Sequence, residues 1–124
     1  MNIRIVVADD CESLRESLRD LFGTMDDIEV VAMAADGHQA LALTRAMKPH
    51  LVVMDIGMPG MNGIEATRRI VAELPGIKVI ALSVHADQRM IALMLDAGAS
   101  EYVVKDFAFE KLAGTIRASV ANQP

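Results

Sequence analysis

Five short apolar runs, separated by segments with helical spacing, limit the folds that this 124-residue chain can adopt. The runs are rich in Val, Ile, Leu, Ala and Met, and they occupy residues 3–8, 29–34, 51–56, 78–83 and 101–104. Short apolar runs of this kind, with little polar alternation, are typical of strands that are covered on both faces, as in a parallel sheet. We therefore predict five buried, parallel strands.

Each run is followed by a segment that carries helix signals. The first and fifth helices are predicted from apolar stripes, Leu14, Leu18, Leu21 and Phe22 with an end at Gly23, and Phe109, Leu112, Ala113, Ile116 and Val120. The second should run from Asp36 to before Pro49, and the third from Asn62 to before Pro75. The fourth should cover residues 87–96, with Gly98 as the stop. Gln39 and Glu65 stand three residues after their capping Asp or Asn, which is the spacing of a capping box. Strand and helix thus alternate five times.

Such alternation predicts right-handed crossovers and a doubly wound α/β sheet. We expect a flavodoxin-like (βα)5 fold with strand order 2-1-3-4-5, whose topological switch point lies between strands 1 and 3. The length and the 52% share of apolar residues suit a single domain with its own core. We assign residues 1–121 to that domain and residues 122–124 to a polar tail that could begin a linker to an output domain.

Charge and cysteine content exclude several classes of function. The net charge of −5 argues against an intrinsic nucleic-acid surface, because phosphate contacts need clustered Lys and Arg. The single cysteine, Cys11, excludes an internal disulfide and suits a reducing compartment. No signal peptide or membrane span is evident, so we expect a cytoplasmic location and no membrane partner. We expect Cys11 to pack under the first helix, with redox sensing as the alternative.

Three aspartates lie where two apolar runs end: Asp9 and Asp10 after residues 3–8, and Asp55 after residues 51–54. At about 5 Å and an effective dielectric near 20, each pair of carboxylates repels by roughly 3 kcal/mol. A common reason to keep such a cluster is to hold a hard divalent cation beside a reacting oxygen. The alternative is that these residues only cap turns and helices. Because the switch point falls at the same strand ends, we favour the cation site.

Two further strand ends add a hydroxyl, Ser83, and an ammonium group, Lys105. A nucleotide or flavin phosphate would need a Gly- or Ser/Thr-rich turn after the first strand, whereas residues 8–12 are acidic there. The combination of acids, hydroxyl and lysine suits transfer of a phosphoryl group onto a carboxylate, with Mg²⁺ and Lys105 balancing the charge.

The motifs that carry this chemistry resemble those of two-component response regulator receiver domains. They are Val-Ala-Asp-Asp at residues 7–10, Met-Asp-Ile-Gly-Met-Pro-Gly-Met-Asn-Gly at 54–63, Leu-Ser at 82–83, and Asp-Ala-Gly-Ala-Ser-Glu-Tyr-Val-Val-Lys at 96–105. The resemblance covers essentially the whole chain. It is strongest to receivers of the NarL/FixJ/LuxR type, which precede a helix-turn-helix DNA-binding domain.

The resemblance implies a role for each site residue. Asp55 would be the phosphoacceptor, Asp10 a direct Mg²⁺ ligand, and Asp9 a residue that acts mainly through water. The Gly57 carbonyl would complete the protein ligands, and Lys105 would pair with the phosphoryl oxygens.

The resemblance also implies a signalling route. Ser83 would hydrogen-bond the phosphoryl group and Tyr102 would swing inward behind it, which would change the face of the fourth helix, fifth strand and fifth helix. A sensor histidine kinase would be the phosphodonor, and homodimerisation could follow phosphorylation. DNA would be bound only through an output domain outside this chain. The chain would not be an enzyme, apart from self-phosphorylation by phosphodonors and slow autodephosphorylation.

Two rival functions are less well supported. A Mg²⁺-dependent phosphatase with an aspartyl intermediate generally needs an Asp-x-Asp pair and a cap, but this chain has Asp55-Ile56-Gly57 and no residues for a cap. An interaction module without phosphorylation would not need Ser83 and Lys105 at matching strand ends.

Some surface residues are harder to assign from sequence. We expect Met58, Met61 and Met90 to be exposed and adaptable. His85, two residues after Ser83, could influence attacking water at the pocket rim. The fourth helix is so apolar over residues 89–95 that some of its side chains should reach solvent or a partner.

Overall fold

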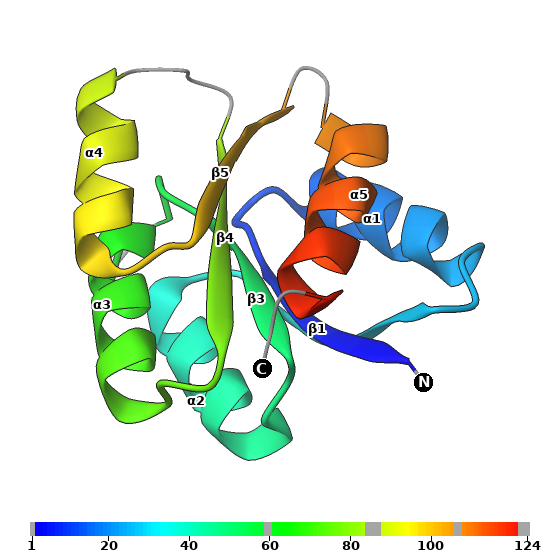
Figure 1. The fold of residues 1–124 in the computed structure, drawn as a ribbon, viewed down its shortest axis with the longest axis horizontal. Coiled ribbons are helices and arrows are strands. Elements are labelled where there is room, and N and C mark those ends of the chain that lie inside the picture. Colours follow the sequence, from blue (N-terminus) through cyan, green and yellow to red (C-terminus); the bar gives the residue numbers. More distant parts are fainter. Residues whose placement is uncertain (1, 59–60, 84–87, 106–107, 122–124) are drawn as a thin grey trace.

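The computed structural model describes residues 2–58, 61–83, 88–105 and 108–121. Within these residues, five strands and five helices alternate along the chain (Figure 1). The strands are β1 (Ile3–Ala8), β2 (Ile28–Ala34), β3 (Leu51–Asp55), β4 (Lys78–Ser83) and β5 (Glu101–Val104). The helices are α1 (Glu12–Gly23), α2 (Gly37–Met47), α3 (Gly63–Glu73), α4 (Gln88–Ala97) and α5 (Ala108–Ala121).

The strands form one parallel sheet in the order β2-β1-β3-β4-β5. Helices α1 and α5 cover one face of the sheet, and α2, α3 and α4 cover the other (Figure 1). This arrangement confirms the predicted doubly wound fold and its strand order. It also places the carboxyl ends of β1 and β3 side by side at the switch point.

The strand bounds differ from the sequence prediction in two places. β2 begins at Ile28 rather than Glu29, because Ile28 pairs with Ile3. β3 ends at Asp55 rather than Ile56, because the Ile56 carbonyl accepts a hydrogen bond from the N–H of Gly63 at the start of α3. Asp87, the expected start of the fourth helix, lies outside the described residues.

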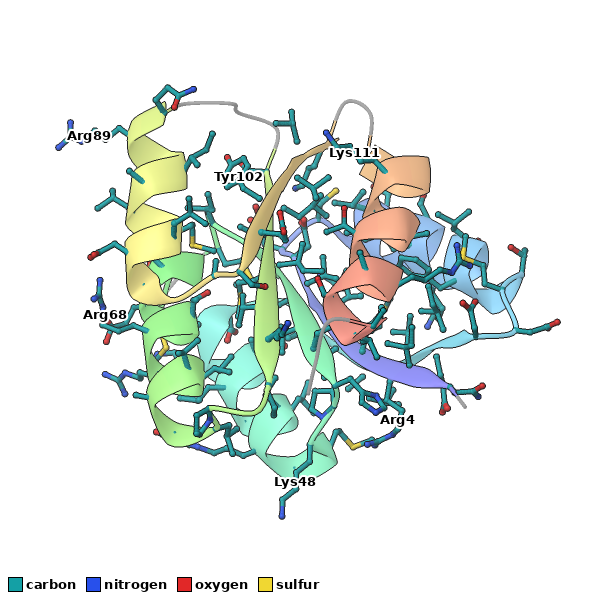
Figure 2. All side chains as sticks on the ribbon, in the orientation of Figure 1. Arg4, Lys48, Arg68, Arg89, Tyr102 and Lys111 are labelled. Carbon is teal, nitrogen blue, oxygen red and sulfur yellow. The ribbon has the colours of Figure 1, made fainter. Side chains whose placement is uncertain are left out.

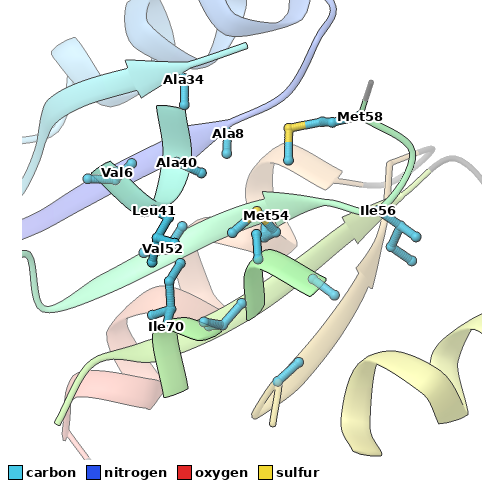
Figure 3. Close-up of a cluster of buried hydrophobic side chains, with 14 of the residues drawn as sticks. Val6, Ala8, Ala34, Ala40, Leu41, Val52, Met54, Ile56, Met58 and Ile70 are labelled. Carbon is cyan, nitrogen blue, oxygen red and sulfur yellow. The ribbon is translucent and has the colours of Figure 1, made fainter. Parts of the chain in front are cut away.

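The core is divided by the sheet into two layers whose residues alternate along each strand. In β3, Val52 and Met54 face α2, α3 and α4, whereas Leu51 and Val53 face α1 and α5. Figure 3 shows the first of these layers, in which aliphatic side chains from the strands meet those of α2 and α3. Burial on both faces explains why the central strand β3 is apolar from Leu51 to Met54 rather than alternating.

Two helices begin as their capping sequences predict. The side chain of Asp36 accepts a hydrogen bond from the Gln39 N–H at 2.8 Å, and Asn62 accepts one from the Glu65 N–H at 2.9 Å. The reciprocal half of the capping box differs, because Glu65 reaches forward to Arg69 at 3.1 Å. At α2, in contrast, the Gln39 side chain reaches back, since its Oε1 accepts a hydrogen bond from the Ala35 N–H at 2.8 Å, so only the start of α3 rests mainly on its N-cap side chain.

The edge strand β2 contains a bulge. Its register with β1 shifts between two pairs, Ile5 with Val30 and Val6 with Ala32, so Val31 is an extra residue. Such an insertion leaves one residue outside the ladder and increases the local twist.

Among the helices of the described residues, none is both long and apolar enough to cross a membrane.

Two methionines contradict the sequence prediction. Met58 and Met61 were expected at the surface but are buried in the core layer below α2 and α3, whereas Met90 is half-buried. Met61 is held there because its carbonyl accepts a hydrogen bond from the Gly37 N–H at 3.0 Å. Among the described residues of the loop after β3, Met58 and Met61 thus belong to the core rather than to a free partner surface.

Candidate functional site

The register of the sheet brings the predicted site residues together. Ala8 lies beside Met54, and Ser83 lies beside Val104. The residues at or just beyond the strand ends therefore meet at one edge of the sheet, and they are Asp9, Asp10, Asp55, Ser83 and Lys105. The edge is the one that the sequence analysis predicts.

The three aspartates form one acidic cluster. Each offers a carboxylate oxygen, and these oxygens lie within 4.8 Å of one another. Asp9 is 1% exposed and Asp55 is 7% exposed, whereas Asp10 is open to solvent. Two buried acids and one exposed acid thus share a small volume.

Lys105 provides the positive charge in this cluster. Its Nζ lies 2.7 Å from Asp9 Oδ2 and 3.7 Å from Asp55 Oδ1. The lysine therefore bridges two carboxylates from neighbouring strands, and its closer partner is Asp9. The sequence pointed to Lys105 as part of the site, but it did not show this pairing with Asp9.

Asp9 is also fixed by two contacts from the start of α1. The Cys11 N–H donates to Asp9 Oδ1 at 2.9 Å, and Arg15 Nη1 donates to the Asp9 carbonyl oxygen at 2.7 Å. Arg15 was missed by the sequence analysis. The available signal was its spacing, since Arg15 follows Cys11 by one helical turn and so returns to the same side of the helix.

Burial and charge shift the pKa of two site residues. The pKa of the Asp55 carboxyl is raised, first by burial and then by the negative charge of Asp9, against the opposing effect of Lys105. Burial acts to lower the pKa of Lys105, but the hydrogen bond to Asp9 and the surrounding acids raise it overall. Lys105 therefore stays charged, whereas the ionised form of Asp55 is disfavoured by its surroundings.

Cys11 does not pack under α1 as expected. It is exposed at the N-cap of α1, and its Sγ lies 3.5 Å from Ser13 Oγ. The contact with Ser13 lowers the pKa of the thiol. The prediction failed because Leu14 and Leu18, not Cys11, carry the inward-facing side of the helix.

Two glycines allow a close approach to the backbone of Asp55 and of Met61. A Cβ on Gly63 would lie 1.9 Å from the Asp55 carbonyl oxygen, and one on Gly37 would lie 2.0 Å from the Met61 carbonyl oxygen. The helices α2 and α3 therefore begin in direct contact with the loop backbone. Gly57, in contrast, is exposed and has open space around its Cα.

Ser83 and Tyr102 lie on the same face of the sheet. Ser83 is buried at the end of β4, two residues beyond Ala81, which pairs with Tyr102 of β5. Tyr102 is partly buried against the core layer of α2, α3 and α4, and Figure 2 shows it on the α4 side of β5. His85 lies outside the described residues.

Helix α4 beside Tyr102 exposes apolar side chains, as the sequence predicts. Leu93 is 40% exposed and Leu95 is 47% exposed, and they are the large hydrophobic residues that stand out at the described surface. Met94 between them is fully buried. The buried stripe of α4 is therefore narrow, with a leucine on each side.

The acidic cluster fits a hard divalent cation. Carboxylate oxygens are the ligands that Mg²⁺ prefers, and it usually takes only one or two from the protein together with water. The exposed carboxylate of Asp10 would leave such an ion accessible to solvent. The donor set thus agrees with the metal that the sequence analysis predicts.

Comparison with known proteins places these features in a family. Residues 5–117 match the response regulator receiver domain family. The chain is 42% identical over 113 residues to an uncharacterized transcriptional regulatory protein, YhcZ, of Bacillus subtilis, which covers 91% of this chain and 53% of that protein. The chain spans about half the length of the curated relatives it matches.

Solved structures share the fold over nearly the whole chain. A two-component response regulator of the LuxR family from Aurantimonas sp. SI85-9A1 superposes with a TM-score of 0.93 at 35% identity, covering 99% of this chain and 88% of that one. The response regulator domain of Thermotoga maritima CheB gives a TM-score of 0.92 at 29% identity, with full coverage of both chains.

Proposed function

The chain belongs to the response regulator receiver domain family, and we propose that it is a phosphorylation-activated switch that accepts a phosphoryl group on Asp55. The observation that carries the proposal is the cluster of Asp9, Asp10 and Asp55 with the Lys105 ammonium group between two of its carboxylates. A sensor histidine kinase is the proposed donor, as the family implies.

In the proposed reaction, a carboxylate oxygen of Asp55 attacks the phosphorus. A new O–P bond forms while the bond from phosphorus to the donor's histidine nitrogen breaks, and its electron pair leaves with that nitrogen. Lys105, which contacts both Asp9 and Asp55, is placed to pair with the phosphoryl oxygens. When bound, Mg²⁺ would neutralise part of the negative charge on the transferring group.

The proposed Mg²⁺ ligands are Asp10, Asp55 and the Gly57 carbonyl, with Asp9 acting mainly through water. The exposure of Asp10 supports a direct role, because its carboxylate is open to an incoming ion. Asp9 is instead already bound to Lys105 and to the Cys11 N–H, which supports an indirect role.

We assign the output to the face formed by α4, β5 and α5. Ser83 is proposed to bind the new phosphoryl group, and Tyr102, on the same face of the sheet, to follow it inward. The exposed leucines of α4 support this choice, since apolar side chains at a surface commonly mark a binding site. Homodimerisation through this face is the proposed consequence of phosphorylation.

The relatives support a proposal for the wider role. Transcriptional regulatory proteins are among them, and this chain matches about half of their length. We propose that residues 1–121 form the receiver unit of a cytoplasmic transcription regulator, with residues 122–124 at the start of a linker to a helix-turn-helix domain. The receiver would catalyse only its own phosphorylation and slow dephosphorylation.

The test is incubation with a small acyl phosphate in the presence and absence of Mg²⁺, followed by intact-mass analysis. We expect a single Mg²⁺-dependent, hydroxylamine-sensitive addition that Asp55→Asn abolishes, because an amide cannot act as the nucleophile. Asp26→Asn, at an exposed acid that precedes β2 and so lies at the amino ends of the parallel strands, is the control and should be labelled normally. An undiminished, hydroxylamine-sensitive addition to Asp55→Asn would overturn the assignment.

A further inference from the structure

Arg15 contacts the backbone between the two adjacent acids of the site. Its Nη1 donates to the Asp9 carbonyl oxygen at 2.7 Å, across a sequence separation of six residues. The bond is charge-assisted and partly buried, so it is stronger than a neutral surface hydrogen bond. It reaches the main chain rather than a carboxylate, and so it does not neutralise the acids directly.

The bonded carbonyl belongs to the peptide that joins Asp9 to Asp10. A peptide unit is a rigid plane, so fixing its oxygen also fixes the direction of the Asp10 N–H. Any rotation of this plane changes the φ angle of Asp10 and with it the direction in which the Asp10 carboxylate leaves the backbone. The orientation of an exposed acid therefore depends on a guanidinium group in α1.

Asp9 does not need Arg15 in the same way. Its N–H donates to the Ala34 carbonyl at 3.0 Å, its Oδ1 accepts from the Cys11 N–H, and its Oδ2 pairs with Lys105. Asp10 is exposed and lies beyond the end of β1, where the sheet no longer holds the chain. Loss of the Arg15 contact should therefore affect Asp10 more than Asp9.

From this arrangement we infer that Arg15 is a positioning residue of the cation site, which aims the Asp10 carboxylate by locking the Asp9–Asp10 peptide plane. The inference rests on the proposed function for the identity of the cation. It adds that the affinity for Mg²⁺ is set in part by a residue of α1 that bears the same sign of charge as the ion.

The sign of charge makes the inference testable. A cation near a Mg²⁺ site repels the ion, so removal of its charge alone should strengthen Mg²⁺ binding. Loss of a residue that orients a ligand should weaken it, typically by about 10- to 100-fold. The two effects have opposite directions.

The experiment is a calorimetric Mg²⁺ titration of the whole chain and of its Arg15→Ala, Arg15→Lys and Arg19→Ala variants. Arg19 is the matched control, because it is an exposed arginine one turn further along α1. We expect Arg15→Ala to weaken Mg²⁺ binding about tenfold or more. Arg15→Lys, which keeps a charged N–H donor on a shorter side chain, should retain part of the affinity. Arg19→Ala should bind Mg²⁺ as well as or slightly better than the parent.

Thermal unfolding in a chelator checks that each variant folds. If Arg15→Ala does not fold, Arg15→Gln takes its place, and Arg15→Lys should then bind Mg²⁺ more tightly than Arg15→Gln. Equal or tighter Mg²⁺ binding by folded Arg15→Ala would overturn the inference, as would equal affinities of the Ala and Lys variants. If the parent binds Mg²⁺ but Asp55 takes no label, the proposed function fails while the Arg15 comparison still stands. If Asp55 is labelled and Arg15 has no effect on Mg²⁺ affinity, only the inference fails.

Discussion

At the scale of single residues, Asp55 holds its negative charge under conditions that oppose it. Burial and the nearby Asp9 raise its pKa above the ordinary 3.8, so the folded chain binds a proton at Asp55 more tightly than the unfolded chain does. Ionisation of Asp55 therefore lowers the free energy of unfolding. This loss is absent below the ordinary pKa and is complete once the pH exceeds the raised pKa of the folded state. Without a metal, the ionised carboxylate destabilises the fold near neutral pH.

Asp55→Asn should accordingly stabilise the metal-free protein, because it removes this charge while leaving Lys105 paired with Asp9. We expect the gain in unfolding free energy to be largest near about pH 7 and to shrink as the pH falls toward about 4. Urea unfolding in a chelator at several pH values provides the measurement. Asp20→Asn, an exposed acid of α1, should show little gain, and a pH-independent gain for Asp55→Asn would contradict this account.

Thr67 is a second residue whose environment conflicts with its chemistry. It is fully buried in α3, and its hydroxyl has no hydrogen-bond partner among the described residues. A buried hydroxyl without a partner costs about 1–3 kcal/mol. Thr67→Val, which replaces the hydroxyl with a methyl group of similar size, should therefore raise the unfolding free energy by about 1 kcal/mol.

The measurement is a pair of urea unfolding curves, with Thr67→Ser as the matched variant. The serine keeps the unpaired hydroxyl and loses a buried methyl group, so it should destabilise. A loss of stability in Thr67→Val would show instead that the hydroxyl is bonded in solution.

At the scale of elements, the start of α3 determines where β3 ends. Gly63 leaves no room for a Cβ beside the Asp55 carbonyl oxygen, and backbone atoms cannot give way as a flexible side chain can. Gly63→Ala should therefore push α3 away from β3, destabilise the fold and lower the rate of Asp55 labelling. Both effects can be measured on one preparation, by thermal unfolding and by acyl phosphate labelling.

Gly114, in the interior of α5, is the control for Gly63. A Cβ there meets no atom within 4 Å, so Gly114→Ala should stabilise by about 1 kcal/mol through helix propensity alone. The two Gly→Ala substitutions are therefore expected to change the free energy of unfolding in opposite directions. Stabilisation by Gly63→Ala would show that the two elements are not locked together.

The elements themselves could be predicted from the sequence because local and tertiary signals agree. Strands such as β3 are apolar on both faces, and helix starts such as Asp36 carry their own caps. Met58, Met61 and Cys11 could not be placed, because their burial depends on how the loop after β3 and the start of α1 fold against distant elements. The Arg15 contact was missed for a different reason: its spacing from Cys11 places it on the right side of α1, but sequence patterns do not mark the backbone carbonyl that it binds.

At the scale of the whole molecule, the acidic site and the α4 surface are linked through β4 and β5. Ser83 sits at the edge of the site, and Tyr102 lies on the same face of the sheet toward α4. We expect a beryllofluoride mimic to change self-association through α4, β5 and α5, with a coupling of about 5- to 150-fold in affinity. Sedimentation velocity with and without the mimic is the measurement.

Tyr102→Ala should lower this ratio without preventing Asp55 labelling, because Tyr102 packs against the core layer of α2, α3 and α4 and is not part of the acidic cluster. Leu93→Ser combined with Leu95→Ser should abolish the association in both states if α4 forms the contact. An undiminished ratio in Tyr102→Ala would place the route elsewhere in the molecule.

The bulge at Val31 limits how copies of this molecule can meet. An open edge of a parallel sheet offers a row of backbone groups on which another chain can add a strand, which is a common start of aggregation. The extra residue and added twist in β2 put that row out of phase with any regular strand laid beside it. Association is thereby directed away from this edge toward the helical surfaces, where side chains rather than backbone decide which partner fits.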